Sequence, residues 1–341
     1  MHSFAYKNGS LYCEDVRLAD IAAAVGTPTF VYSKKTITED LAEFREALSP
    51  LDAHVAYAVK ACSNKAILNL MVQQGVGFDI VSGGELWRVI NAGGDATLCT
   101  YAGVGKTEAE IRYALEQNIY CFNCESENEL RAINRIAGEM GVKAPVAVRV
   151  NPHVDAHTHK YITTGTNENK FGVDITRIEE LYATIAAEMP HLRIRGLQMH
   201  IGSQLTEIKP FVEAIEKVAP IVRKFIDRYG IEFWSIGGGI GIVYDGCLAS
   251  GSLRVLPSHR YLPSIVNVTH NLSFLDFAFV KIYISVKCLL LRDMLGFGLT
   301  ACFDFHIAEL LYNHFHAIFH HHLPPSQNRN SRESGAALPA M

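Results

Sequence analysis

The sequence predicts an α/β protein built on a (β/α)8 TIM-type barrel, incomplete at strand 8, with a remnant of a small β-domain at the N-terminus. Short apolar runs alternate with amphipathic stretches from about residue 51 to residue 241. Such alternation is typical of parallel strands joined by helices. Seven such runs occur and an eighth is expected, which fits a barrel better than the alternative, an open doubly wound sheet.

The N-terminal segment, residues 1–34, is expected to belong to the β-domain. Phe4–Tyr6 and Leu11–Tyr12 flank an Asn-Gly pair, which favours a hairpin turn. A short helix is expected at Leu18–Val25 and a strand at Thr29–Tyr32. These elements are too few to form a stable sheet alone, so we expect strands from elsewhere to complete the domain.

Residues 35–246 are expected to form the barrel, because their apolar runs are rich in β-branched and aromatic residues. The runs are Val55–Val59, Gly77–Val81, Leu98–Ala102, Tyr120–Asn123, Val146–Val150, Leu197–Ile201 and Phe233–Ile236. Helical patterns, with apolar residues spaced by three and four, lie between them at Lys65–Val72, Glu85–Asn91, Glu108–Leu115 and Glu127–Ile136. Asn64 and Ser126 are placed to cap two of these helices.

Residues 247–341 form a divergent tail whose fold the sequence does not predict. Positions 251–341 hold 12 charged residues, against 54 in the first 250. The apolar stretch Phe274–Phe305 is interrupted by charges, so it does not fit a membrane span. His320–His322 lacks ligand spacing on a scaffold, and we predict no metal there. The simplest hypothesis is a frameshift or an incorrect gene model near Gly246.

Composition excludes several classes of protein. With 341 residues and a net charge of -4, the chain has neither the size of a small module nor the basic charge of a nucleic-acid or membrane-surface binder. The N-terminus, Met1–Lys7, lacks the pattern of a signal peptide. Eight cysteines fit ordinary intracellular usage, and Cys121 and Cys124 have no second pair to complete a zinc site. We therefore expect a cytoplasmic protein without a metal.

Lys60 directly follows the first apolar run, Val55–Val59, which fits a buried strand. A lysine is rarely buried unless it is paired or has a function. Burial lowers the pKa of an amine and makes it a better nucleophile toward a carbonyl. Lys60 is therefore a candidate catalytic residue; the alternative is a lysine at a strand end that extends into solvent.

Gly237, Gly238, Gly239 and Gly241 follow the seventh run directly. Glycines there let backbone N–H groups close on an anion, but the dinucleotide-binding pattern G-x-G-x-x-G is not completed. In a barrel the loops after strands 7 and 8 are a favoured phosphate site, and strand 1 lies beside strand 8. Lys60 would share this rim, which suggests pyridoxal 5'-phosphate held by the lysine as a Schiff base. The alternative is a glycine turn that serves packing only.

Four more residues lie at strand ends or in the loops that follow. His200 ends the sixth run, where an imidazole can stack on a pyridine ring, and Ser203 could donate to phosphate. A lone histidine at a strand end is more often structural, but beside Lys60 and the glycine loop we favour a cofactor role. Asp79 and Glu85 could pair with the lysine or set its protonation, and Glu85 could instead complement a helix dipole.

With these residues assembled, the chain resembles the alanine-racemase-like (fold type III) pyridoxal-phosphate decarboxylases, and among them the diaminopimelate decarboxylases. The resemblance covers Phe4–Tyr244. The matching motifs are Gly26–Ser33, Tyr57–Lys60, Gly77–Leu86, Gly103–Lys106, His200–Gln204 and, longest of all, Asn151–His153 through Thr158–Gly165 to Lys170–Gly172. That long stretch looks like the diaminopimelate enzymes rather than ornithine or arginine decarboxylases, or a racemase.

The resemblance implies a role for each candidate residue. Lys60 carries the cofactor, His200 stacks on its ring, and Ser203 with Gly237–Gly241 binds its phosphate. Arg149, at the end of the fifth run, is a further member of the pocket. The implied reaction is decarboxylation of meso-diaminopimelate to L-lysine by a homodimer, with the substrate amine displacing Lys60.

The family continues past the glycine loop with a Glu-Pro-Gly-Arg segment, whose glutamate keeps the pyridine nitrogen protonated and whose arginine helps to bind substrate. No such segment follows Tyr244, and the family's C-terminal β-domain is not matched. We therefore expect an open edge at the eighth strand position and low or no decarboxylase activity. The alternatives are a non-catalytic barrel that binds pyridoxal phosphate, and an inactive remnant of a decarboxylase.

Overall fold

The computed structural model describes residues 3–49, 51–154, 171–205, 207–241 and, for the backbone alone, 280–285. The expectations for the tail 247–341, including that for His320–His322, lie outside the described residues, except for one strand. Thr158–Lys170, the larger part of the diagnostic stretch Asn151–Gly172, also lies outside them.

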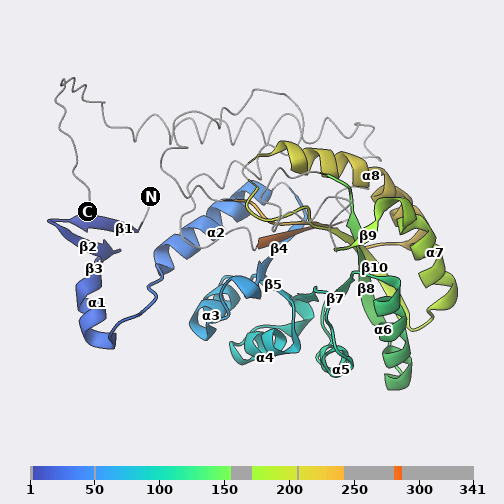
Figure 1. Ribbon diagram of the computed structural model, residues 1–341, viewed down its shortest axis with the longest axis horizontal. Helices are drawn as coiled ribbons and strands as arrows, with labels where there is room; N and C mark the ends of the chain where they lie inside the picture. Colours follow the sequence, from blue (N-terminus) through green and yellow to red (C-terminus); the bar gives the residue numbers. More distant parts are fainter. Residues whose placement is uncertain (1–2, 50, 155–170, 206, 242–279, 286–341) are drawn as a thin grey trace, which may run out of the picture.

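The N-terminal hairpin and helix form as predicted. β1 (Phe4–Lys7) and β2 (Ser10–Cys13) pair antiparallel, and β3 (Val16–Arg17) extends the sheet before α1 (Leu18–Val25). The two turn residues, Asn8 and Gly9, have φ of 52° and 78°, as this tight turn requires. Figure 1 shows this small sheet apart from the barrel, at the far end of α2 (Lys34–Leu48).

The strand predicted at Thr29–Tyr32 is wrong: this segment is irregular, and Phe30 is 88% exposed. Its β-propensity has no effect here because, within the described part of the chain, it pairs with no neighbouring strand. The segment leads into α2, where Ser33 caps the helix by accepting a hydrogen bond from Thr36 N. Glu14 Oε1 accepts from Ser33 Oγ at 2.7 Å and ties the hairpin to the helix.

The seven predicted parallel strands are all present. They are β4 (Ala53–Ala58), β5 (Gly77–Ile80), β6 (Cys99–Tyr101), β7 (Cys121–Cys124), β8 (Ala144–Asn151), β10 (Leu192–Met199) and β11 (Phe233–Gly237). The connecting helices are α3 (Lys65–Gln73), α4 (Gly83–Asn91), α5 (Glu108–Glu116), α6 (Glu127–Met140), α7 (Ile178–Glu188) and α8 (Lys209–Tyr229). Short 3-10 turns occur at Val59–Ala61, Ala96–Leu98 and Ile175–Arg177.

The sheet closes on itself in the order β10, β11, β12, β4, β5, β6, β7, β8, with β8 pairing back to β10. β12 (Val280–Ser285) occupies the eighth position and runs antiparallel to both β11 and β4. No parallel strand stands there in the described residues, as the incomplete barrel predicted. The expected open edge is not observed, since β12 pairs with both neighbouring strands. This pairing is favourable because an unpaired strand edge leaves backbone groups without hydrogen-bond partners. A short strand, β9 (Val173–Asp174), adds to the end of β8.

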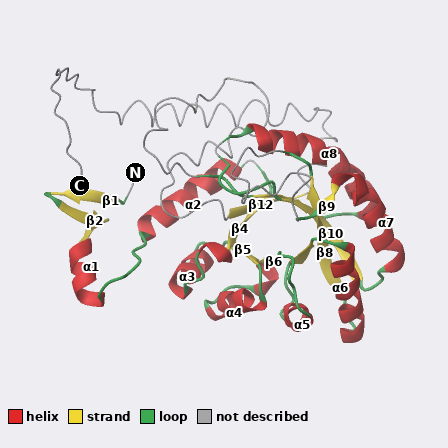
Figure 2. Ribbon diagram, in the orientation of Figure 1, coloured by secondary structure: helices red, strands yellow, loops and turns green. Residues whose placement is uncertain are grey.

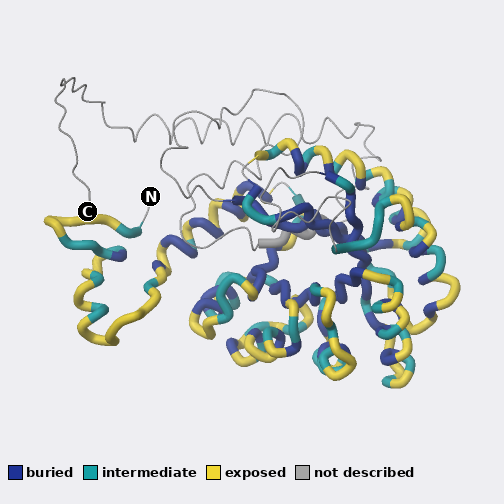
Figure 3. Tube along the Cα trace, in the orientation of Figure 1, coloured by how far each residue is buried: buried dark blue, intermediate teal, exposed yellow. Residues whose placement is uncertain are grey.

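The helices lie outside the ring of strands (Figure 2), and their buried faces turn inward while their outer faces are exposed (Figure 3). Both predicted caps form. Asn64 Oδ1 accepts from Ala66 N at 2.8 Å, and Ser126 Oγ accepts from Glu129 N at 3.2 Å. Each cap satisfies one backbone donor that the first turn of a helix leaves open.

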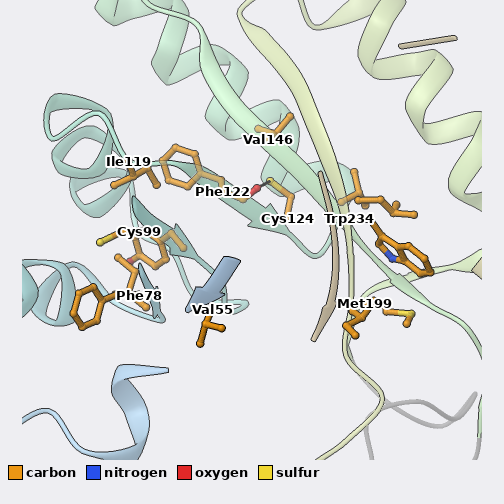
Figure 4. Close-up of a cluster of buried hydrophobic side chains, with 14 of the residues drawn as sticks. Val55, Phe78, Cys99, Ile119, Phe122, Cys124, Val146, Met199 and Trp234 are labelled. Carbon is orange, nitrogen blue, oxygen red and sulfur yellow. Dashed lines mark hydrogen bonds between the residues drawn. The ribbon is translucent and has the colours of Figure 1, made fainter. Parts of the chain in front are cut away.

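The core fills the barrel and the layer beneath the helices. Phe78, Cys99, Phe122 and Val146 come from four successive strands and are at most 1% exposed (Figure 4). Alternation along each strand sends side chains to the barrel interior and to the helices in turn, so both layers are apolar.

A bulge in β10 is stabilised by one tyrosine. The pairing of β10 with β8 slips between Ile194 and Gly196. Tyr182 Oη, from α7, donates to Gly196 O at 2.6 Å and accepts from Val148 N at 3.3 Å. The hydroxyl thereby satisfies backbone groups that the slipped ladder leaves unpaired.

Candidate cofactor site at the carboxyl end of the barrel

The candidate residues gather at the carboxyl ends of the parallel strands. Asp79 lies on β5, Arg149 near the end of β8, and His200 directly after β10. Gly237 ends β11 and begins the glycine loop. Carboxyl ends of parallel strands share one rim of a barrel, which is where barrel enzymes carry their sites.

Lys60 is placed differently from the expectation of a buried lysine. β4 ends at Ala58, and Lys60 lies in the turn Val59–Ala61 that follows, with its side chain exposed. The preceding residue, Val59, is fully buried, whereas Lys60 lies beyond the end of the strand and is exposed. The lysine side chain is therefore accessible to solvent rather than desolvated in the barrel wall.

The carboxyl group of Glu85 lies near this lysine, and Asp79 lies near Glu85. Burial raises the pKa of Glu85, the charge of Asp79 raises it further, and Lys60 opposes the rise. Glu85 Oε2 accepts from Val81 N at 2.7 Å. Asp79 is 1% exposed, and its Oδ1 accepts from Thr100 Oγ1 at 3.1 Å. Lys60 and Glu85 thus place an amine near a carboxylic acid whose pKa is above its usual value.

His200 contacts the glycine loop directly. Its side chain is buried, and Gly238 N donates to His200 Nδ1 at 3.4 Å. With Nδ1 as the acceptor, the neutral ring carries its proton on Nε2. The backbone of the seventh loop thus orients the imidazole that follows the sixth parallel strand.

Three glycines of the loop are required by packing against residues 199–204. A Cβ at Gly237 would lie 2.5 Å from Met199 O, and one at Gly239 would lie 1.8 Å from Gly202 O. A Cβ at Gly241 would lie 2.7 Å from the carbonyl carbon of Gln204. The packing role that the sequence left open therefore applies to these three positions.

The other two candidates are Ser203 and Arg149. Ser203 is half-buried in the loop after β10. Arg149 is buried, donates from Nη1 to Glu125 Oε1 at 2.9 Å, and donates from Nη2 to the carbonyl oxygen of His200 at 3.3 Å. The structure thus brings together Arg149, His200 and the glycine loop, while Lys60 lies two strand positions from β11, about 10 Å at ordinary strand spacing.

Glu125 and Thr100 contact candidate site residues, Arg149 and Asp79, but were not predicted from the sequence. Glu125 directly follows β7 and Thr100 lies in β6, and both are buried. The rule that singled out Asp79, a polar residue at the end of an apolar run, also applies to Glu125. In the sequence, Glu125 stands just before the cap Ser126 and the acidic first turn of α6, so it resembles part of that helix start rather than a strand-end residue.

The cysteine pair is buried in the barrel wall. Cys121 and Cys124 are fully buried and not disulfide-bonded, and burial raises the pKa of both thiols. In the part of the chain that the structure describes, His, Cys, Asp and Glu side chains form no group that could hold a metal ion. None of the described helices combines the length and the apolar character needed to cross a bilayer.

A barrel of parallel strands, with a lysine after its first strand and a glycine loop after its seventh, defines the class of the pyridoxal-binding TIM-type barrels. The chain belongs to the pyridoxal-dependent decarboxylases: the family model of their pyridoxal binding domain matches residues 34–252. Pyridoxal phosphate is therefore the cofactor of this fold, as the sequence predicted.

Several relatives are diaminopimelate decarboxylases. The chain is 47% identical over 245 residues to that of Pseudomonas aeruginosa, and 46% identical over 245 residues to that of Haemophilus influenzae. Each match covers 72% of this chain and 59% of the relative, so the chain spans well under two thirds of their length.

Solved structures agree. The diaminopimelate decarboxylase of Helicobacter pylori complexed with L-lysine has a TM-score of 0.65 at 37% identity, over 67% of this chain and 58% of that one. That of M. jannaschii in co-complex with L-lysine has a TM-score of 0.66 at 32% identity, over 86% and 63%. An arginine decarboxylase of Paramecium bursaria Chlorella virus, at 22% identity and a TM-score of 0.53, shares the fold alone.

Proposed function

We propose that the barrel binds pyridoxal phosphate at the carboxyl ends of its strands and bonds it through Lys60. One observation carries the proposal: Gly238 N donates to His200 Nδ1, which joins an imidazole to the glycine loop at the carboxyl end of the barrel, the end at which Lys60 follows β4. These groups match the cofactor part by part, with an amine for its aldehyde, a flat ring for its pyridine and peptide N–H groups for its phosphate. When bound, the cofactor supplies an electron sink for a carbanion next to an amino group.

Each candidate residue of the chain would then have a separate role. His200, with its ring oriented by Gly238, would lie against the pyridine, and Ser203 would donate to the phosphate. Glu85 would lie beside the Lys60 amine as a carboxyl group whose pKa burial raises above its usual value. Asp79 and Arg149 are proposed as the buried charged residues of the pocket.

The proposed reaction of the fold is decarboxylation of meso-diaminopimelate to L-lysine in the cytoplasm, by a homodimer. Its support is the set of relatives above, two of which were solved with L-lysine. For this chain alone we propose low or no turnover. The sequence after Tyr244 favours the second candidate, a barrel that binds the cofactor without catalysis, because the Glu-Pro-Gly-Arg segment is absent there.

The test compares Lys60→Ala with Lys65→Ala, a control at an exposed lysine that begins α3. Purified chain is titrated with pyridoxal phosphate, and its visible absorbance and the release of carbon dioxide from meso-diaminopimelate are measured. We expect cofactor absorbance in the wild type and Lys65→Ala, its loss in Lys60→Ala, and little carbon dioxide. Absorbance that survives Lys60→Ala would refute the site, and rapid carbon dioxide release would refute the non-catalytic candidate.

A further inference from the structure

The carboxylate of Glu125 is a buried junction between three segments of the rim. It follows β7 and is 8% exposed. Its Oε1 accepts from Arg149 Nη1 at 2.9 Å, and its Oε2 accepts from Gly172 N at 3.0 Å. Both oxygens are therefore used, one by a charged partner, which is the arrangement that makes a buried carboxylate tolerable.

Arg149 extends this junction to the loop after β10. Its Nη2 donates to the carbonyl oxygen of His200 at 3.3 Å, and its guanidinium carbon lies 5.1 Å from the centre of the Phe171 ring. Gly172, with φ of +80°, approaches so closely that a Cβ there would lie 3.0 Å from Arg149 O. One ion pair thus fixes the end of β7, the end of β8 and the backbone of His200.

Two contacts of the described residues help to position the His200 ring. Arg149 holds the carbonyl oxygen of this residue, and Gly238 N donates to its Nδ1. Glu125 is the acid paired with Arg149 among the described residues, so its removal leaves a buried cation without this counter-charge, which is strongly unfavourable. The guanidinium would then turn toward water and release the His200 carbonyl.

We infer that Glu125 is a positioning residue of the cofactor site, which acts by holding Arg149 against the backbone of His200. Its contact with the proposed pocket is through Arg149, so its effect on the His200 ring is indirect. The inference rests on the proposed function, because it assigns the held imidazole to the cofactor ring, but its first consequence concerns the protein without cofactor.

The first experiment therefore uses the cofactor-free chain. Glu125→Gln keeps the size of the side chain, removes its charge, and replaces one acceptor oxygen by a donor. Hydrogen exchange measured by mass spectrometry should show at least about tenfold faster exchange in peptides covering residues 200–205 and 233–241, because local opening becomes easier there. The matched control is Glu232→Gln, which also removes an acid paired with arginines (Arg193 and Arg195), but before β11 at the opposite rim. Unchanged exchange in Glu125→Gln would overturn the inference whether or not the chain binds cofactor.

The second experiment measures affinity for pyridoxal phosphate by fluorescence quenching, with the melting temperature followed in parallel. We expect Glu125→Gln to raise Kd about tenfold or more and Glu232→Gln to leave it within about twofold. In a His200→Ala background, Glu125→Gln should change Kd by less than about twofold while still lowering the melting temperature, because the effect on affinity passes through the His200 ring. An equal rise in Kd in both backgrounds would show a purely structural role. Absence of any binding by the wild type would refute the proposed function, and the hydrogen-exchange result would then decide the role of Glu125 by itself.

Discussion

Replacing Gly239 by alanine should break the contact between the glycine loop and the loop after β10. The new Cβ would lie 1.8 Å from Gly202 O, where no side-chain carbon can be accommodated, and the backbone there has φ of +98°. Leu205 is hydrogen-bonded to the glycine loop on both sides of Ile240. Its N donates to Gly239 O at 2.8 Å, and its O accepts from Gly241 N at 2.8 Å. The clash must therefore be relieved by moving backbone rather than by rotating a flexible side chain.

The magnitude follows from two costs. A strained backbone conformation costs about 1–3 kcal/mol, and overpacking costs typically about 1–3 kcal/mol. We expect Gly239→Ala to lower the free energy of unfolding by roughly 2–6 kcal/mol. The assay is urea unfolding followed by fluorescence of Trp234, which is 3% exposed and lies on the adjoining strand β11.

Gly105→Ala is the matched control, because a Cβ at this position would meet nothing within 4 Å. Alanine there should be neutral or stabilise by up to about 1 kcal/mol through the unfolded state. The reasoning fails if the two variants unfold within about 0.5 kcal/mol of each other, since uncoupled surface changes have effects of that size.

Three other substitutions test the interior. Lys106→Met removes a buried ammonium that donates to Gly103 O, Asn123 O and Glu129 Oε1 at 2.7, 3.0 and 2.6 Å. It should lower the free energy of unfolding by about 3–5 kcal/mol in urea unfolding at pH 7. The loss should be smaller at pH 5, because the Glu129 carboxyl, left without its partner, can take up a proton there. Tyr182→Phe removes the hydroxyl at the β10 bulge and should lower stability by about 1–3 kcal/mol in the same assay. Asp40→Asn tests pH dependence: burial raises the pKa of this carboxyl from 3.8 to about 7, so the folded state binds more protons between these values and stability falls as pH rises through them. That loss is at most about 4 kcal/mol, and the variant should show a flatter stability profile between pH 4 and pH 7.

Each of these has a clear contrary result. An unchanged urea midpoint for Lys106→Met at pH 7 would mean that its carboxylate partner is already neutral. Equal stability of Tyr182→Phe and the wild type would mean that water replaces the hydroxyl at the bulge. If the free energy of unfolding changed equally between pH 4 and pH 7 in the wild type and in Asp40→Asn, the Asp40 carboxyl would not be desolvated in the folded state.

Periodicity and turn chemistry account for most of the fold. The seven parallel strands, the hairpin around Asn8 and Gly9 and the caps at Asn64 and Ser126 were all predictable, because each depends on local pattern or on one side chain meeting a nearby backbone group. The segment Thr29–Tyr32 was not, because β-propensity becomes a strand only where a neighbour offers its edge.

The sequence by itself determined the family, the cofactor and the rim on which Lys60, His200 and the glycine loop were expected, because strand order along the chain sets which ends point the same way. Tertiary structure alone decided which of these residues touch. The exposure of Lys60, the bond from Gly238 N to His200 Nδ1, and the junction of Glu125 with Arg149 depend on distances between segments far apart in the chain. So does the antiparallel β12, which pairs with both β11 and β4 at the eighth position of the barrel. A local pattern fixes the direction and burial of one element, but a contact between elements is set by packing that no single segment encodes.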